Sequence, residues 1–553
     1  MPAVRHFARR DWTSAAVLVG YVLVAFVYWG ARLLPHPGRA YIGTSTDPQI
    51  FIWSIAWWPH AIAHGVNPFY THSIWAPEGV NLAWTTSVPG IALLVAPLTW
   101  LFGAVVSYNV ATLLMPGLAA WTAFLLCRHI TRSLWPSLVG GYLFGFSAYM
   151  AGQIGAHMHM DSVFLLPLVA LVVLRFVEGE LGGRALVVRL GPMLALQLAF
   201  STENTFTYTL ALGTAIALGF LFAPSARRRL VALALPLVTS YALAAVLVAP
   251  LVYYALSGFT SGSVNEPAPY TTDLLNLLVP TPRLLGGGWH LTSTISQHFP
   301  GNDGERAGYL GLPSLVIVGL FAARRWRTQA GRVLLAGFVV GIVATFGIWL
   351  VVDGHKAVTM PWEHVAYLPL FNNVLPSRLM LFVVLITAII VALWMNSSRG
   401  WIRIALPSLA VLSFIPDPSA DTWKTTAFVP QFFRGGDVRR CVAPNENVLI
   451  LPQAKHGYGM LWQVAAGFRF RMADGYVAPD VPNNFMTTPA IARIANRQVT
   501  WPDLVPFARA KNVTTVLVDA SASDPWRSIL RPLAPPRAVG GMLVYRFDKT
   551  ARC

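Results

Sequence analysis

The chain has 553 residues, of which 55% are hydrophobic and only 11% are charged, and its formal net charge is +17. A soluble domain has about 25% charged residues, and a soluble protein this apolar would expose large adhesive patches. Composition therefore excludes an ordinary soluble protein and predicts one that crosses a membrane several times. The positive charge does not indicate a nucleic-acid partner, because the basic residues are divided among the connections between apolar segments.

Eleven apolar runs are predicted to be membrane-spanning helices, for which about 20 residues suffice. The run at 86–104 is apolar too, but Pro89 and Pro97 interrupt it and no basic residue flanks it. We therefore expect a re-entrant or interfacial segment there. The expected spans are 12–33, 106–126, 134–153, 162–176, 186–202, 205–223, 230–252, 308–323, 333–352, 378–396 and 401–416.

The arginine clusters predict how these spans are oriented. If the eleven spans cross and 86–104 does not, every cluster falls on one face, which the positive-inside bias assigns to the cytoplasm. The N-terminus is then cytoplasmic, and the first span is too long for the core of a signal peptide, so we expect it to be retained. The expected external segments are 34–105, 154–161, 201–204, 253–307, 353–377 and the tail from about 417.

Asp47 is an acidic residue just after the first span, in a chain with only 23 Asp and Glu residues. The pair Asp47-Pro48 is a favourable helix start, because the carboxylate can cap free N–H groups while proline suits the first turn. Several tryptophans in 48–64 then predict a helix that lies in the membrane interface. Asp47 is interpreted either as a helix cap or, because of its external position, as a catalytic base.

A second group of polar residues, His157-Met158-His159-Met160-Asp161, lies at an outer connection. In an extended turn, alternate residues point the same way and could present two imidazoles and a carboxylate to a phosphate or a divalent transition metal. The alternative is a hydrated hairpin in which Asp161 caps the next helix.

Three further connections carry candidate residues. Glu203 lies in the tight turn 201–204, where it could form a wall of an active-site cavity, act as a second acid, or be solvated. Arg378 breaks the positive-inside pattern, and it could bind a phosphate or extend to lipid headgroups. In the glycine-rich loop 253–307, His290, His298 and Arg306 are secondary candidates for a donor site, although a flexible linker is equally permitted.

The tail from 417 changes character. Strands are predicted at 448–451, 514–518 and 541–545, and helices at about 487–496 and 501–511, which together indicate a small external α/β domain. No nucleophile triad, phosphate loop or zinc spacing is present in it, so we predict acceptor recognition or scaffolding. The three cysteines are too few for a disulfide framework. The expected domains are 1–416 and 417–553.

Two motifs in the first external segment carry a family resemblance. They are Asp47-Pro48 with Trp53, Trp57 and Trp58, and the turn Gly65-Val66-Asn67-Pro68-Phe69. Together with a basic N-terminus and one preceding span, they resemble bacterial integral-membrane GT-C glycosyltransferases of RgtA-to-RgtD-like or YfhO-like architecture. The likeness covers about residues 1–415. It implies an all-α polytopic membrane domain with about 11 transmembrane helices and interfacial helices in the first external loop, followed by the α/β domain.

The resemblance also implies chemistry. Such enzymes move a sugar from a polyprenyl-phosphate donor to a lipid, glycan or protein acceptor at the external face of the bacterial inner membrane, usually with inversion, and Asp47 matches their general base. Many members carry an acidic pair in this loop; here the next acid is Glu78, so Glu203 is the candidate second acid. No nucleotide or redox cofactor is expected, and a divalent cation is a candidate. The implied phosphate contacts are His157, His159, Arg378, His290 and Arg306, and the candidate metal ligands are Asp161, His157 and His159.

Two other function classes fit parts of this pattern. A flippase or transporter of lipid-linked sugars would place ionisable residues at mid-depth in the membrane, whereas the expected spans are nearly uncharged at their centres. A non-catalytic accessory subunit would keep its activity without Asp47. Within the enzymes, a ligase that transfers whole glycans would depend on arginine and histidine without Asp47.

Overall fold

The structure is a computed structural model that describes residues 2–44, 46–258, 268–420, 423–477, 482, 485, 489–547 and 553, with side chains from Trp12 onward. It divides into two compact units, each described by itself below. The helical unit comprises Met1–Pro35, Val110–Ala249 and Thr260–Lys424, and the mixed unit comprises His36–Asn109, Pro250–Phe259 and Thr425–Cys553. This division differs from the boundary expected after residue 416, because the first long connection packs with the tail into the same unit.

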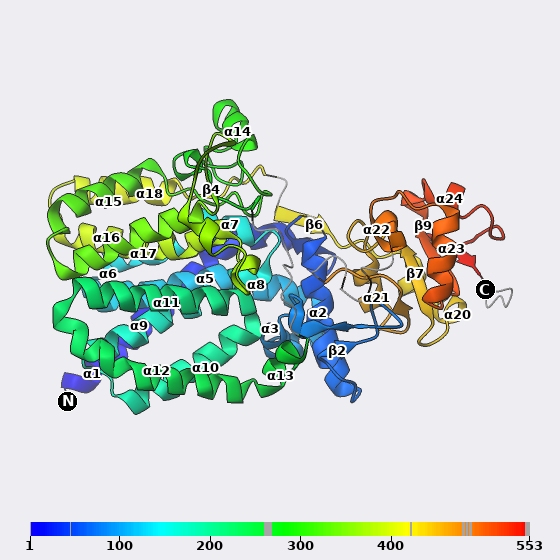
Figure 1. The fold of residues 1–553 in the computed structure, drawn as a ribbon, viewed down its shortest axis with the longest axis horizontal. Coiled ribbons are helices and arrows are strands. Elements are labelled where there is room, and N and C mark those ends of the chain that lie inside the picture. The colour runs from blue at the N-terminus through cyan, green and yellow to red at the C-terminus, as the bar shows by residue number, and fades with distance from the viewer. Residues whose placement is uncertain are drawn as a thin grey trace. The chain divides into compact units, whose positions relative to one another are not determined.

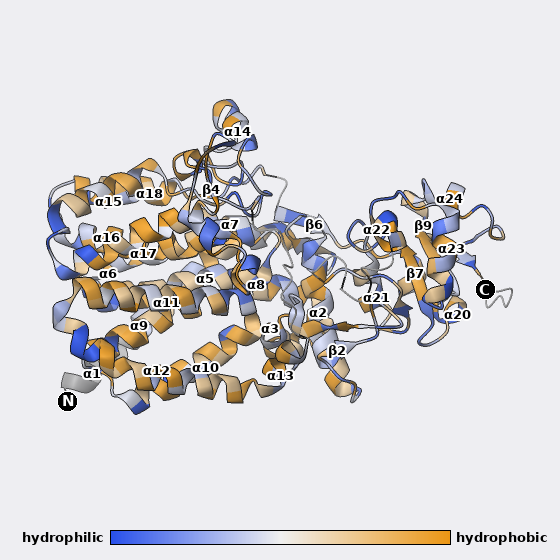
Figure 2. Ribbon diagram, in the orientation of Figure 1, coloured by the Kyte–Doolittle hydropathy of each residue, from blue (hydrophilic) through white to orange (hydrophobic). Residues whose placement is uncertain are grey.

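The helical unit is a bundle of apolar helices, shown in Figure 1 and coloured by hydropathy in Figure 2. The segments are helical because membrane-spanning backbone must satisfy its hydrogen bonds internally, and they are apolar because their side chains lie in the hydrocarbon core. Its helices are α1 (Pro2–Ala25), α5 (Ala104–Thr131, which begins in the mixed unit), α6 (Leu134–Gly145), α7 (Ala148–Gln153), α8 (Met158–Asp161), α9 (Leu165–Val177), α10 (Gly183–Phe200), α11 (Thr202–Phe222), α12 (Arg227–Leu247), α14 (His290–Gln297), α15 (Leu312–Arg325), α16 (Gln329–Thr345), α17 (Met380–Ser397) and α18 (Ile402–Leu412).

Short turns complete this unit. They are η1 (Phe26–Gly30), η2 (Ala31–Leu33), η4 (Pro224–Ala226), η5 (Leu275–Leu277), η6 (Pro361–His364), η7 (Phe371–Asn373), η8 (Pro376–Leu379) and the hairpin of β4 (Trp349–Val352) with β5 (His355–Thr359).

Helix α17 forms the centre of the bundle, where it packs against α6, α15 and α16. Most of its length is buried, whereas α11 and α12 expose most of their apolar side chains, as helices that face lipid do. Helix α6 approaches α5 closely through small residues: a Cβ atom at Gly141 would lie 2.5 Å from the Ala120 carbonyl oxygen. Such small residues let membrane helices pack backbone to backbone.

Seven helices of the described residues are long and apolar enough to cross a membrane. Each of the other four expected spans also contains a helix, but α15, α16 and α18 are shorter, and the expected span 134–153 is divided into α6 and α7. The run 86–104 forms two short helices, α3 (Pro89–Leu94) and α4 (Ala96–Phe102), and no spanning helix.

The mixed unit contains a five-stranded sheet in the order β10-β11-β9-β7-β8, in which β7 pairs in parallel with β8 and β9. The strands predicted from the tail are therefore present, and the structure adds two short ones. The sheet strands are β7 (Asn447–Leu451), β8 (Arg471–Met472), β9 (Thr515–Asp519), β10 (Arg537–Val539) and β11 (Met542–Arg546), and the tail helices are α19 (Gln431–Arg434), α20 (Asp437–Cys441), α21 (Gly459–Ala465), α22 (Pro489–Ala495), α23 (Trp501–Ala510) and α24 (Trp526–Ile529), with η11 (Ala520–Ala522).

The first long connection supplies the rest of the mixed unit. Its elements are β1 (Ala40–Ile42), which pairs with β6 (Lys424–Thr426), α2 (Asp47–Ala63), β2 (Tyr70–Thr71) with β3 (Val80–Asn81), η3 (Leu82–Trp84), α3 and α4; α13 (Ala249–Ser257) lies mostly in this unit as well.

Helix α2 is present as predicted, but its tryptophans do not face lipid headgroups. Trp53, Trp57 and Trp58 are all buried inside the mixed unit, and the indole of Trp53 donates to Gln463 Oε1 on α21 at 2.7 Å. Most of the exposed large apolar side chains of this connection instead belong to α3 and α4: Leu93, Leu94, Trp100, Leu101 and Phe102.

A disulfide joins Cys441 to Cys553 across 112 residues of sequence. It ties the last residue of the chain to the end of α20. No pattern in the sequence predicts this bond, because a single pair of cysteines 112 residues apart has no characteristic spacing. Cys127 is buried and free.

Candidate functional site

A buried ion cluster lies in the helical unit around Arg378. The Arg378 side chain is carried by η8, at the start of the α17 span, and only 8% of it is exposed. Its Nη1 donates to Glu203 Oε2 at 2.5 Å, while Nε and Nη2 donate to Glu305 Oε1 at 2.9 and 2.6 Å. One guanidinium is thus held by two carboxylates, which neutralises its charge.

Glu305 is the most deeply buried member of this cluster, with 1% of its side chain exposed. Its second oxygen accepts from Ser377 Oγ at 3.3 Å and Gln153 Nε2 at 3.4 Å. Burial alone would raise the pKa of Glu305, but the Arg378 guanidinium, followed by His157, lowers it below its ordinary value. The turn 301–306 is polar in sequence, yet nothing local indicates that Glu305 points into a bundle, and the sequence analysis does not select it.

Glu203 lies in the first turn of α11, where Ser201 caps the helix through the Asn204 backbone N–H. Its side chain is 19% exposed and is fixed by Arg378. The structure therefore places Glu203 in the wall of this cluster and not in a solvated turn. Whether it acts as a second acid stays a prediction.

His157 joins the cluster from the N-terminal end of α8. Its Nδ1 is 2.8 Å from Gln153 Oε1 and 3.6 Å from Glu305 Oε1. His159 is buried, and its backbone carbonyl accepts from Asn204 Nδ2 at 2.9 Å. The segment 157–161 is therefore neither an extended turn nor a hydrated hairpin, because α8 coils it and packing buries most of it.

Asp161 is fully buried, and neither of its carboxylate oxygens has a hydrogen-bond partner among the described residues. Helix α9 begins at Leu165 after Phe164, so Asp161 does not cap it. The opposite charge that acts on Asp161 is that of Arg283, whose Nη1 donates to the backbone carbonyls of Ala151 and Gly152. Burial lowers the pKa of the Arg283 guanidinium, and the neighbouring carboxylates, Asp161 among them, oppose that shift. An unpaired buried carboxylate is costly and favours gain of a proton, a cation or a polar ligand.

The predicted metal ligands do not form a compact set. The rings of His157 and His159 are 6.0 Å apart and nearly perpendicular. In the part of the chain that the structure describes, the three-residue group whose ligand atoms all lie within 4.8 Å is His129, Glu178 and Glu180. Arg175 and Arg132 already pair with Glu180 of that group. His157, His159 and Asp161 are thus not brought together as a three-ligand group among the described residues.

The three loop candidates lie outside the buried cluster. His298 is exposed, and its Nδ1 is 2.8 Å from Asp353 Oδ1. His290 is the first residue of α14 and is exposed. Arg306 is next to Glu305 in sequence, but its Nη1 faces Asp303 at 3.4 Å. A role for any of the three at the donor phosphate stays a prediction.

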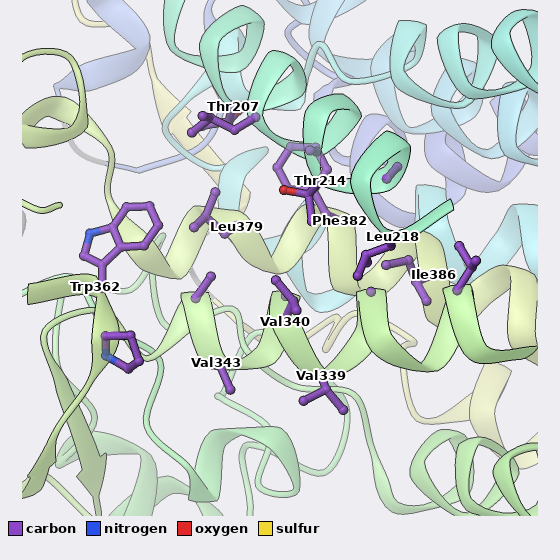
Figure 3. A pocket seen from close by; sticks show the side chains of 18 of the residues that line it. Thr207, Thr214, Leu218, Val339, Val340, Val343, Trp362, Leu379, Phe382 and Ile386 are labelled. Carbon is purple, nitrogen blue, oxygen red and sulfur yellow. The ribbon is translucent and has the colours of Figure 1, made fainter. Parts of the chain in front are cut away.

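An apolar cavity of about 550 Å³ opens between α11, α16 and α17 of the helical unit (Figure 3). Leu379 and Phe382 line it from the α17 span, Thr207 and Thr214 from α11, and Trp362 closes one end. Residues that line the cavity are close in sequence to residues of the ion cluster. Leu379 directly follows Arg378, and Thr207 lies one helical turn beyond Glu203 on α11.

Asp47 is the candidate residue of the mixed unit. It is the first residue of α2 and is partly buried, with Thr46 at the N-cap position. The Tyr476 hydroxyl donates to Asp47 Oδ1 at 2.5 Å. This tyrosine lies 429 residues away, and no local pattern in the sequence selects it.

The fold and these sites define a class of protein. The fold combines a bundle of apolar helices, a first long connection whose longest helix begins at Asp47, and a tail with a mixed sheet. The chain is a multi-pass membrane protein with the GT-C glycosyltransferase fold. The family described as a domain of unknown function, DUF6311, matches residues 17–415, and the chain belongs to this family.

Solved structures are similar in fold. The arabinofuranosyltransferase AftD from Mycobacteria has a TM-score of 0.55 at 15% sequence identity, over 98% of this chain and 40% of that one. The oligosaccharyltransferase AglB from Archaeoglobus fulgidus, in complex with an inhibitory peptide and a dolichol-phosphate, has a TM-score of 0.50 at 12% identity, over 98% of this chain and 75% of that one. The chain thus spans less than half the length of AftD. No curated protein sequence matches it.

Proposed function

We propose that this protein is a membrane glycosyltransferase that moves a sugar from a polyprenyl-phosphate donor to a hydroxyl of a lipid, glycan or protein acceptor. One observation carries the proposal: within a GT-C fold, Asp47 begins α2 and its carboxylate is held by the Tyr476 hydroxyl. A carboxylate that only caps a helix would not need a distant phenol to orient it.

The proposed reaction is a single displacement with inversion. Asp47 accepts the proton of the acceptor hydroxyl while the acceptor oxygen forms a bond to the anomeric carbon. The bond from that carbon to the phosphate oxygen breaks, and the electron pair leaves with the polyprenyl phosphate. General-base help of this kind contributes about 10²–10⁴ in rate.

The apolar cavity supports a lipid-linked donor. Its walls belong to α11, α16 and α17 and present almost only apolar side chains. We assign it to the isoprenoid chain of the donor, with the phosphate towards Arg378 and His157. Arg378 has five N–H donors and uses three of them on carboxylates, so it retains N–H groups for a phosphate. The dolichol-phosphate in the AglB complex is a lipid carrier of the same chemical class.

Two independent features support one orientation of the chain in the membrane. The arginine clusters favour a cytoplasmic N-terminus. The Cys441–Cys553 disulfide supports an external tail, because disulfides persist in oxidising compartments. We propose that the reaction takes place at the external face of a plasma membrane and that the tail recognises the acceptor.

The test is transfer by the purified full-length protein from undecaprenyl-phosphate arabinofuranose, glucose and mannose to a membrane glycan extract. We expect wild type to use at least one donor and Asp47→Asn to transfer about 10²–10⁴-fold more slowly. Asp524→Asn is the matched control, since this aspartate of the same unit is exposed. Equal rates for wild type and Asp47→Asn would contradict the role of Asp47. Movement of lipid-linked sugar across vesicles without transfer would instead identify a transporter.

A further inference from the structure

We infer that Tyr476 is a positioning residue for Asp47, so that residues 473–476, directly after β8, form part of the active site. This inference rests on the proposed function, since it assigns Asp47 the role of base. Its primary observation is the hydrogen bond from the Tyr476 hydroxyl to Asp47 Oδ1 at 2.5 Å. A hydroxyl that donates to one carboxylate oxygen fixes the rotation of the carboxylate.

Backbone pairing holds the segment that carries Tyr476. The N–H of Met472 donates to the Ser73 carbonyl at 2.8 Å, and the N–H of Ala76 donates back to the Met472 carbonyl at 2.9 Å. The N–H of Trp75 donates to the Asp474 carbonyl at 3.0 Å. The first long connection is thus paired, residue by residue, with the chain that leads to Tyr476.

The residues just before Tyr476 permit little movement. A Cβ atom at Gly475 would lie 2.8 Å from Nε1 of the buried Trp75, so the backbone passes directly over the indole. Gln453 Nε2 donates to the Gly475 carbonyl at 2.7 Å. Asp474 is fully buried, and its Oδ2 accepts from the Ala454 N–H at 3.2 Å. Burial raises the pKa of this carboxyl to about 7, which favours its neutral form.

The start of α2 is anchored to the same part of the mixed unit. Thr46 Oγ1 donates to the Lys455 carbonyl at 2.6 Å, immediately before Asp47. Two turns further along α2, Trp53 donates to Gln463, whose Nε2 donates to the carbonyls of Ser73 and Phe470. Both partners of the Asp47–Tyr476 hydrogen bond are therefore held from either side, as a catalytic group that must keep one orientation requires.

The experiment is a double-mutant cycle on transfer by the full-length protein with the undecaprenyl-phosphate sugar that wild type uses. Tyr476→Phe removes the hydroxyl alone, and we expect kcat to fall about 10- to 100-fold, the range for a hydrogen bond to a charged group, with little change in KM for the donor. In the Asp47→Asn background, Tyr476→Phe should cause no further loss, because the pair acts as a unit. The matched control is Tyr545→Phe on β11, which should leave kcat unchanged.

Two outcomes would overturn the inference: equal kcat for Tyr476→Phe and Tyr545→Phe, or a loss that is the same in both Asp47 backgrounds, which indicates a merely structural tyrosine. The contact itself can be tested without activity. The fluorine NMR signal of a fluorotyrosine at position 476 should shift in Asp47→Asn and not in Asp524→Asn. If the signal shifts but wild type transfers no sugar, the contact stands and the proposed function fails; if it does not shift, the inference fails.

Discussion

Two groups of carboxylates in this protein are held in opposite ways. In the helical unit, Glu305 and Glu203 close around Arg378, and almost none of Glu305 reaches solvent. In the mixed unit, Asp47 stays partly exposed at the start of α2, and its carboxylate accepts from a phenol. Burying charge requires a partner of opposite sign, whereas a partly exposed carboxylate does not. We therefore expect the loss of Arg378 to lower stability as well as donor binding, and the loss of Asp47 to affect the chemical step alone.

The largest expected effect comes from Arg378→Met. This change leaves two buried carboxylates without their counter-charge, and breaking such a network costs about 3–5 kcal/mol. Thermal unfolding of the full-length protein in detergent should show a large fall in Tm. Arg403→Met, on an exposed part of α18, is the matched control and should leave Tm unchanged. If Arg378→Met keeps its Tm and loses only donor binding, the cluster serves as a phosphate site more than as a structural one.

The second-largest expected effect is on how stability depends on pH. The sign of this dependence should differ between the two units. Burial raises the pKa of Asp474 to about 7, so between about pH 4 and pH 7 the folded chain keeps a proton that the unfolded chain has lost. Stability of the mixed unit should therefore fall as the pH rises through this window, by at most about 1.4 kcal/mol per pH unit.

Asp474→Asn should remove that slope, because the amide stays neutral and can still accept from Ala454. The slope of stability against pH can be measured by hydrogen exchange of β7 and β9 on the acidic and on the alkaline side of this window. The pKa of Glu305 is lowered instead, so its contribution is lost only as the pH falls below the ordinary range of glutamic acid. An unchanged slope in Asp474→Asn would show that the carboxyl is ionised in the folded protein.

The smallest effect is expected for Glu203→Gln. The amide oxygen can still accept from Arg378, and Glu305 still balances the charge, so we expect a loss of about 1 kcal/mol in stability. The readouts are Tm and the rate of sugar transfer, with Glu363→Gln as the control because that side chain is exposed on η6. If Glu203→Gln instead slows transfer by about 100-fold or more while Tm hardly changes, Glu203 acts as the second acid.

Much of the architecture could be predicted because its signals are local. Apolar runs separated by arginines indicate a polytopic bundle, and Pro89 and Pro97 indicate that 86–104 does not cross. The expected exposure of the α2 tryptophans to lipid headgroups was wrong: Trp53, Trp57 and Trp58 pack inside the mixed unit. Hydropathy alone does not distinguish an apolar face that meets lipid from one that meets another part of the chain.

The sequence by itself determined that the protein is a membrane protein, that a helix begins at Asp47, and that the tail folds as strands and helices. Each of these depends on neighbouring residues and on the period of their side chains. Only the tertiary structure decided that Arg378 is closed by Glu203 and Glu305, that Tyr476 reaches Asp47, and that Cys441 bonds Cys553. These partners are separated by 73 to 429 residues, and such pairs are set by how whole elements pack, which no local pattern encodes.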